Sequence, residues 1–175
     1  MEATAELAGT ATVPRPEKHP VKKVLVIVSK GTLEDVYAGL IMANGALMEG
    51  IQAELFFTFF GLEAIKKDTQ DHLHTATVGN PAMMRQMPTI LAGLPGFEAL
   101  VSTMMKKEME KLDIPPVSEF LQIISESGGK IHACRLAVDM FKLKREDFID
   151  ELEDIITVGE MYALAEGANT QIIFI

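Results

Sequence analysis

The feature that most constrains the fold is the apolar run Val24-Leu25-Val26-Ile27-Val28, which is mostly β-branched. A continuous run of this kind is typical of a strand that is buried on both faces of a parallel sheet. Parallel strands must be joined by long crossover connections, which are usually helices. The run therefore predicts an α/β domain.

The rest of the chain repeats this alternation of strand and helix. Turn residues and apolar periodicity separate the predicted elements. Such alternation predicts a three-layer α/β/α sandwich of flavodoxin-like type with a mainly parallel five-stranded sheet. The predicted strands are 24–28, 53–57, 130–133, 154–157 and 170–175, and the predicted helices or helix-like pieces are 33–49, 62–67, 97–112, 117–126, one beginning at 145–150, and 158–166.

The length of 175 residues suits one domain with a substantial core. Residues 1–20 lack periodicity and are rich in Ala, Thr, Glu and Pro, so we expect a flexible tail followed by a single domain over 21–175. Within it, 68–116 is an irregular excursion that holds many of the methionines. Its amphipathic segment Phe97–Leu112 either contacts another subunit or partner, or packs internally, and the pattern favours neither.

Charge and composition exclude several classes of function. The net charge of −9 argues against non-specific nucleic-acid binding and against attraction to anionic lipids. No signal peptide and no apolar run of transmembrane length is found, and a single cysteine excludes an internal disulfide, so we expect a cytoplasmic protein. Neither a phosphate-binding loop nor a zinc-ligand spacing is present, although His72 and His74 lie close together. We expect no metal and no cofactor.

The only cysteine, Cys134, follows the predicted strand Lys130–Ala133 and precedes a helix-compatible stretch. Open α/β sheets place their chemistry at the carboxyl ends of their strands. A helix N-terminus and the adjacent Arg135 both favour a thiolate there. The alternative is a packed thiol, since free cysteine is among the most buried residue types.

Other strand ends would meet Cys134 at the same edge of a parallel sheet. These carry Ser29, Lys30, Gly31, Thr58, Phe59, Arg135, Val158 and Gly159, a set that suits an anion or a persulfide.

Two polar residues lie on apolar faces. Asn44 falls on the apolar stripe of the helix 33–49, which also includes Ile41 and Met48; it either holds a neighbouring loop or lines the site. His132 lies two residues before Cys134 on the same strand face, about 6–7 Å away at the backbone. It either tunes the thiol or is a core histidine.

From residue 22 to its end the chain resembles the DsrE/DsrF family of small sulfur-relay proteins, in particular the DsrE-like subgroup. Matching segments occur in the family's order along the chain. They are Gly31-Thr32-Leu33, Ala43-Asn44, 56–62, 80–83, Leu94-Pro95-Gly96, 104–107, 115–117, Ala133-Cys134 through Val138-Asp139-Met140, 148–151 and 168–175.

The resemblance implies an α/β/α sandwich of DsrE-like type, oligomerisation, and a cysteine that carries sulfane sulfur as a persulfide. Cys134 occupies the position of that cysteine. The family usually has Ser-Met-Asp shortly after it, where this chain has Ala137-Val138-Asp139, and some relatives have a second cysteine that this chain lacks. Without a resolving thiol an internal disulfide cycle cannot form, which favours a sulfurtransferase-like carrier over a peroxidase.

Three hypotheses follow. The chain is a persulfide carrier, or sulfurtransferase component, that passes sulfur from a donor protein to an acceptor protein. In it Arg135 stabilises the anion on Cys134, and Lys30, Gly31, Asn44, Thr58 and Asp139 shape the substrate site. Alternatively it is a non-catalytic flavodoxin-like module for a nucleotide or small anion, or an oligomeric scaffold in which Cys134 is only core.

Overall fold

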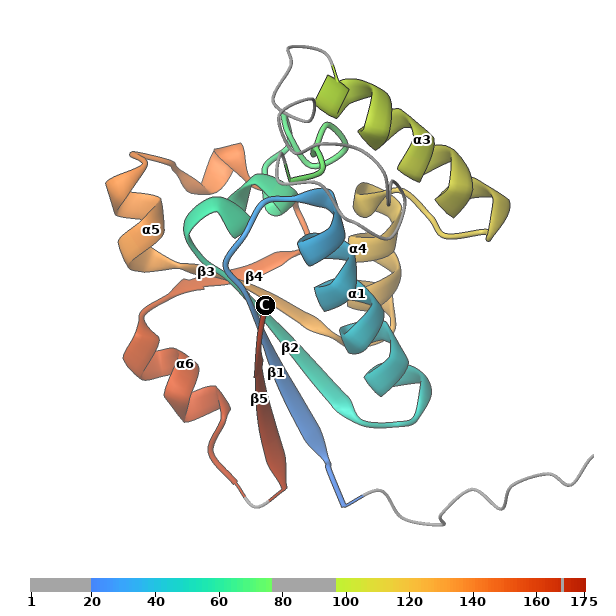
Figure 1. Ribbon diagram of the computed structural model, residues 1–175. Coiled ribbons are helices and arrows are strands. Elements are labelled where there is room, and N and C mark those ends of the chain that lie inside the picture. The colour runs from blue at the N-terminus through green and yellow to red at the C-terminus, as the bar shows by residue number, and fades with distance from the viewer. Residues whose placement is uncertain (1–19, 77–96, 168) are drawn as a thin grey trace, which may run out of the picture.

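The computed structural model describes residues 20–76, 97–167 and 169–175, and it contains one sheet of five parallel strands (Figure 1). The sheet order is β4-β3-β2-β1-β5. Every strand pair in it is parallel, which confirms the predicted α/β class. The strands are β1 (Lys23–Val28), β2 (Gln52–Phe57), β3 (Lys130–Cys134), β4 (Leu152–Ile156) and β5 (Thr170–Phe174). The predicted tail lies almost wholly outside the described residues.

Helices lie on both sides of this sheet. The helices α1 (Leu33–Met48) and α4 (Val117–Glu126) pack against each other and against β1, β2 and β3. Helix α6 (Val158–Leu164) lies on the opposite side, and α5 (Arg135–Met140) follows β3 at the carboxyl edge (Figure 1). Helix α3 (Phe97–Lys111) lies beyond the ends of α1 and α4 (Figure 1). Among the described parts of the chain, no helix is long and apolar enough to cross a bilayer.

Helix α1 buries one narrow stripe, formed by Leu33, Val36, Tyr37, Leu40, Ala43 and Ala46. Two residues assigned to that stripe from the sequence were placed wrongly, because Ile41 is 51% exposed and Met48 is 78% exposed. At 100° of rotation per residue, Ile41 and Met48 lie about 120° and about 100° from the centre of the stripe, on the exposed side of the helix. The helical spacing of the buried residues was predicted correctly, but the buried face of α1 is narrower than predicted.

The segment before β4 also differs from its prediction. Instead of an α-helix, Arg145–Asp147 forms a single 3-10 turn, η2. Phe148 then bridges Lys66, and the Ile149 amide donates to the Ile65 carbonyl at the end of the 3-10 helix η1 (Phe59–Ile65). Because these backbone groups bond across the fold, they cannot continue a helix. Phe148 and Ile149 are nevertheless buried as expected.

Candidate functional site

Cys134 is the last residue of β3 and directly precedes α5. Its backbone is extended, with φ −71° and ψ 117°, and its thiol is free and 4% exposed. The strand β3 lies between β2 and β4, so the residues that follow both neighbours flank the cysteine. The structure therefore places the thiol at the carboxyl edge of the sheet, where the sequence predicted it.

The alternation of β3 divides its side chains between two faces of the sheet. Ile131 and Ala133 are fully buried on one face, and His132 and Cys134 share the other. Strand pairing extends this second face sideways, because His132 is in register with Phe56, and Leu25 is in register with Glu54. Cys134 thus shares a sheet face with the charged residues of β1 and β2.

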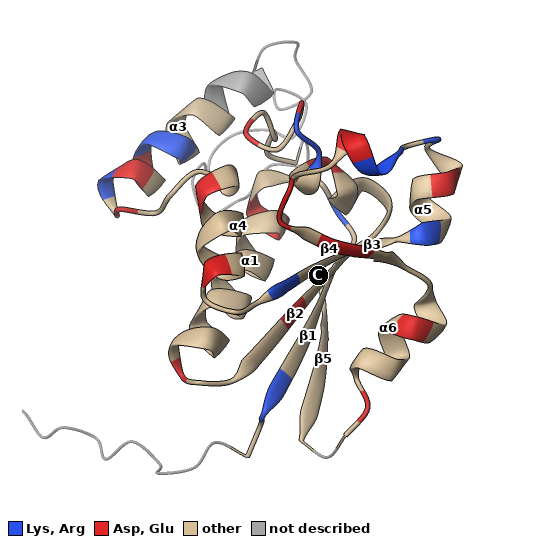
Figure 2. Cartoon of the chain, turned by 180° about the vertical axis from the view of Figure 1, so that it is seen from behind, with Lys and Arg blue, Asp and Glu red and all other residues tan. Residues whose placement is uncertain are grey.

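Those charged residues form a row that crosses three strands, with Glu54 and His132 buried and Lys23 half-buried. Lys23 Nζ lies 3.2 Å from Glu54 Oε1, and Glu54 Oε2 lies 2.7 Å from His132 Nε2. Lys23 Nζ also donates to the carbonyl of Leu164 at the end of α6. Figure 2 shows the basic segment of β1 beside the acidic segment of β2. We call Lys23, Glu54 and His132 the charged row.

The charged row has a defined electrostatic state at Glu54. Burial alone would raise the pKa of this carboxyl, but hydrogen bonds from His132 and Lys23, together with their charges, hold the pKa below its usual value. At the other end, His132 Nδ1 is buried and has no hydrogen-bond partner among the described residues. Sequence reasoning missed Glu54 and Lys23. The available signal was a carboxylate inside the apolar strand 53–57.

Arg135 lies at the edge beside Cys134, and its side chain is exposed. Its guanidinium donates to the carbonyl of Ile155 in β4. It also contributes to lowering the pKa of Glu160, after the larger effect of the hydrogen bonds from Thr157. Arg135 therefore ties the start of α5 to β4, and its charge acts on Glu160 in α6.

Thr58 is the predicted site residue that follows the strand next to Cys134. It comes directly after Phe57, which is in register with Ala133, and it is buried. Because adjacent strands lie about 4.8 Å apart, Thr58 and Cys134 are neighbours at the edge of the sheet.

Lys30 and Gly31 belong to the loop after β1, one strand further away. Lys30 is exposed, with its Nζ 3.2 Å from Asp35 Oδ1. A side chain at Gly31 would meet the Phe60 carbonyl oxygen at 2.4 Å, and one at Gly61 would meet the Val28 carbonyl oxygen at 2.2 Å. The two glycines let the loops after β1 and β2 interlock, which shapes the rim of the site without touching the thiol.

Asn44 lies apart from this cluster, whereas Asp139 lies in α5, the helix that follows Cys134. The Asn44 amide donates to Met48 Sδ at 3.6 Å within the same helix. Since α1 begins at the carboxyl edge and rises about 1.5 Å per residue, Asn44 lies roughly 16 Å along the helix from that edge. Asp139 is on the exposed side of α5. The structure therefore does not bring Asn44 to Cys134.

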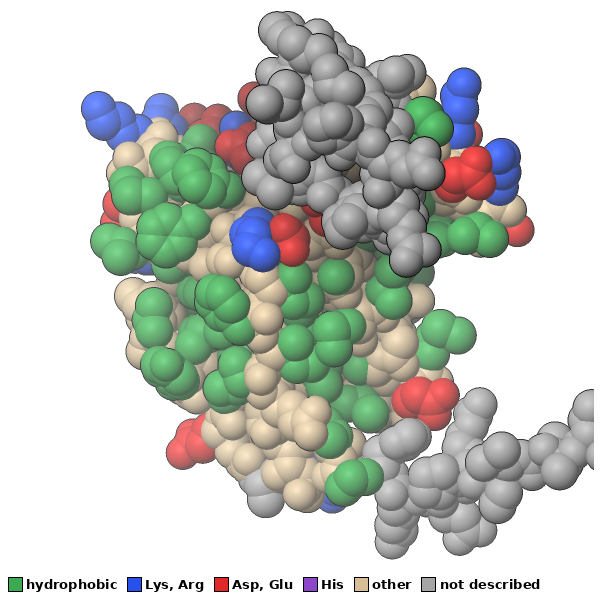
Figure 3. Space-filling view, in the orientation of Figure 1, with side chains coloured by type: hydrophobic (Ala, Val, Ile, Leu, Met, Phe, Trp, Pro, Cys, Tyr) green, Lys and Arg blue, Asp and Glu red, His purple; other side chains and the backbone are tan. Residues whose placement is uncertain are grey.

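The surface beside the thiol is apolar. Phe60 and Leu136 are 66% and 69% exposed, and Phe59, Met140 and Phe141 are exposed beside them in the chain. The Phe60 and Phe141 rings contact each other, with centroids 6.0 Å apart. Figure 3 shows hydrophobic side chains gathered over α5 and η1. We call these five residues the apolar rim.

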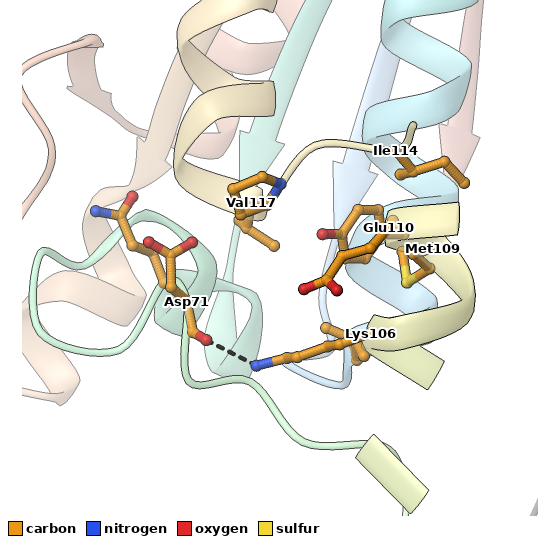
Figure 4. Close-up of a pocket in the computed structure, with 10 residues that line it drawn as sticks. Asp71, Lys106, Met109, Glu110, Ile114 and Val117 are labelled. Carbon is orange, nitrogen blue, oxygen red and sulfur yellow. Dashed lines mark hydrogen bonds between the residues drawn. The ribbon is translucent and has the colours of Figure 1, made fainter. Parts of the chain in front are cut away.

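A separate cavity of about 140 Å³ opens between α1, α3 and the start of α4 (Figure 4). Lys106 Nζ donates to the Asp71 carbonyl there, and the Tyr37 hydroxyl donates to the Pro115 carbonyl. Burial, with a smaller effect of Asp71, raises the pKa of Tyr37 to about 12. This cavity lies on the α1 side of the sheet, away from the charged row.

Metal-binding groups do not gather at either place. Across the described ranges, no three His, Cys, Asp or Glu side chains are arranged to hold a metal ion. His72 and His74 are both exposed.

Comparison with known proteins gives a consistent assignment. The sequence model of the DsrE/DsrF/DrsH-like family matches residues 20–173. The sulfur carrier protein DsrE2 of Allochromatium vinosum is 33% identical over 138 residues, which cover 75% of this chain and 86% of that protein. The uncharacterized protein YrkE of Bacillus subtilis is 22% identical over 86% of this chain and 96% of its own length.

Solved structures share the fold. The protein MTH1491 of Methanobacterium thermoautotrophicum, of unknown function, aligns with a TM-score of 0.55 at 9% identity, over 87% of this chain and 98% of its own. The ychN protein of E. coli aligns with a TM-score of 0.54 at 12% identity, over 89% of this chain and 100% of its own.

Proposed function

The chain belongs to the DsrE/DsrF/DrsH-like family, and from that premise we propose that it is a persulfide carrier that holds sulfane sulfur on Cys134. The observation that carries the proposal is the position of the only cysteine, at the carboxyl end of β3. A relative that is 33% identical bears the name sulfur carrier protein, which supports the same role.

The chemistry needs one thiol and two partners. The Cys134 thiolate attacks the outer sulfur of a donor persulfide, so that the donor's S–S bond breaks as a new S–S bond to Cys134 forms. The donor leaves as a thiolate. An acceptor thiolate then attacks the outer sulfur on Cys134 and restores the free cysteine. Sulfane sulfur moves without net oxidation, so the cycle needs no second cysteine in this chain.

The surroundings of Cys134 suit transfer between proteins rather than release of sulfur to solvent. The thiol is buried, which would shield a persulfide from water. The apolar rim beside it suits contact with donor and acceptor proteins, and with further copies of this chain in a homo-oligomer. The proposed compartment is the reducing cytoplasm, where a lone thiol stays reduced.

The test is direct loading. Native protein incubated with polysulfide, tetrathionate or thiosulfate should gain a sulfur-containing adduct that maps to Cys134 by peptide mass spectrometry. A reductant should remove it, and Cys134→Ser should not form it. If folded protein stays unmodified with every donor, while the unfolded chain reacts, then Cys134 is a packed core thiol and the proposal is wrong.

A further inference from the structure

His132 is a buried titratable group that the proposed carrier cycle does not yet use. It is 4% exposed, and its Nε2 lies 2.7 Å from Glu54 Oε2. Its Nδ1 is buried and has no hydrogen-bond partner among residues 20–76, 97–167 and 169–175. A buried ring nitrogen without a partner is costly to a fold, and in native proteins it calls for an explanation.

The hydrogen on the ring can be assigned from its partners. Lys23 and His132 both bond the Glu54 carboxyl, so that it is an ionised acceptor and Nε2 must be the donor. In a neutral imidazole that donates from Nε2, the Nδ1 atom carries a lone pair. When His132 is neutral, its Nδ1 is therefore a buried base on the same sheet face as the buried thiol, two residues along β3.

We infer that His132 accepts the thiol proton of Cys134 when sulfur is loaded, with Glu54 and Lys23 as the positioning residues that hold the ring for that task. The inference rests on the proposed function, whose cycle starts from a thiolate. A nucleophile, a neighbouring base and a third group that orients the base form the general arrangement for activating a cysteine. Side chains two residues apart on a strand face start about 6–7 Å apart. His132 Nδ1 makes no hydrogen bond to Cys134 Sγ in the structure, so the transfer requires the two side chains to turn toward each other.

The loading step is balanced with respect to protons and bonds. The Cys134 S–H bond breaks and its proton moves to His132 Nδ1, which makes an imidazolium beside the Glu54 carboxylate. The thiolate then takes the outer sulfur of the donor persulfide, and the donor departs as a thiolate. The imidazolium returns the proton to that leaving group, so the base is regenerated and a thiol is released.

Other charged groups near His132 are already engaged elsewhere. Asp154 of β4 is in register with His132, but it is exposed and its carboxylate accepts the Ile155 amide. Lys130, at the start of β3, pairs with Glu153. On the α6 side, Glu160 accepts from Thr157. Among the described residues, Glu54 is thus the charged group that forms a hydrogen bond with the His132 imidazole.

The experiment compares His132→Gln with the wild-type protein and with Asp154→Asn. The Gln amide can replace Nε2 as the donor to Glu54, but it has no counterpart of the Nδ1 base. The control Asp154→Asn changes an exposed charge at the neighbouring position. Polysulfide loading and iodoacetamide alkylation of Cys134 are timed from about pH 5 to about pH 9, which spans the ordinary titrations of His and Cys.

A proton-accepting role predicts that His132→Gln loads at least about 100-fold more slowly near neutral pH, and that its rate recovers only at alkaline pH. Asp154→Asn should follow the wild-type profile. If His132→Gln loads at the wild-type rate with the wild-type pH profile, His132 is only structural and the inference is wrong, while the carrier function stands.

Two further outcomes are separable. If the wild-type protein does not load at all, the carrier function fails, and the alkylation profiles alone decide whether His132 acts on the thiol. If His132→Gln does not fold, Glu54→Gln decides instead, because it keeps the ring and removes the carboxylate charge. An unshifted pH profile in folded Glu54→Gln overturns the inference.

Discussion

The two faces of the sheet at β2 and β3 differ although the same strands form both. On the α1 side, Leu55, Phe57, Ile131 and Ala133 are fully buried and wholly apolar. On the α6 side, the alternate residues Glu54, Phe56, His132 and Cys134 are also buried, but three of these four are titratable. The comparison shows that burial alone does not identify a core position. One face is an apolar core, and the other holds a carboxylate whose partners keep its pKa below the usual value.

The largest expected effect is on the apolar face. Phe57→Ala removes a fully buried ring and should lower the free energy of unfolding by about 3–5 kcal/mol. Urea denaturation measures this. If Phe57→Ala lowered the free energy of unfolding no more than a surface substitution does, the apolar face would not be the source of stability.

The charged face should show its own dependence on pH. Because the folded-state pKa of Glu54 is lowered, its contribution to stability is present above the ordinary glutamate value of 4.5 and is lost as the pH falls through the lower folded value. Glu54→Gln removes that dependence and leaves Lys23 without its ion pair, at a cost of roughly 1–3 kcal/mol at neutral pH. Melting temperatures of the wild-type protein and of Glu54→Gln, measured above and below pH 4.5, test this. If the melting temperatures of the two proteins changed with pH in the same way, the pKa of Glu54 would not be lowered in the folded state.

An effect of similar size is expected where the loops after β1 and β2 interlock. In Gly31→Ala the new Cβ would lie 2.4 Å from the Phe60 carbonyl oxygen, which is backbone and cannot simply rotate away. We expect a loss of about 1–3 kcal/mol from overpacking. Gly45→Ala is the matched control, because no atom lies within 4 Å of a Cβ added there. Equal stability of the two variants would show that the loops do not interlock.

The smallest effect is expected for Arg135→Glu. Its side chain is exposed and bonds a strand carbonyl, so stability should change by no more than about 0.5 kcal/mol. Alkylation of Cys134 should slow a few-fold, because a negative charge replaces a positive one beside the thiolate. Equal alkylation rates in the wild-type protein and in Arg135→Glu would mean that the charge of Arg135 does not affect the Cys134 thiol.

Much of the fold was predictable because its signals are local. Runs of β-branched residues, turn residues and helical spacing place the five strands and most helices within a few residues. They also place Cys134 at a strand end, with Thr58 and Arg135 near it. The local signals failed where tertiary contacts compete, as at 145–149, where backbone bonds to η1 replace a helix.

What the sequence by itself determined is the parallel α/β class and the position of the only thiol at the carboxyl edge. Only the tertiary structure decided which polar residues share a sheet face with that thiol. Lys23 and Glu54 are 31 residues apart, and Glu54 and His132 are 78 apart, so no local pattern links them. They meet because β2 lies between β1 and β3 in the sheet, an order that is set by long-range packing. The same order leaves Asn44 at the far end of α1, although its spacing alone had suggested the site.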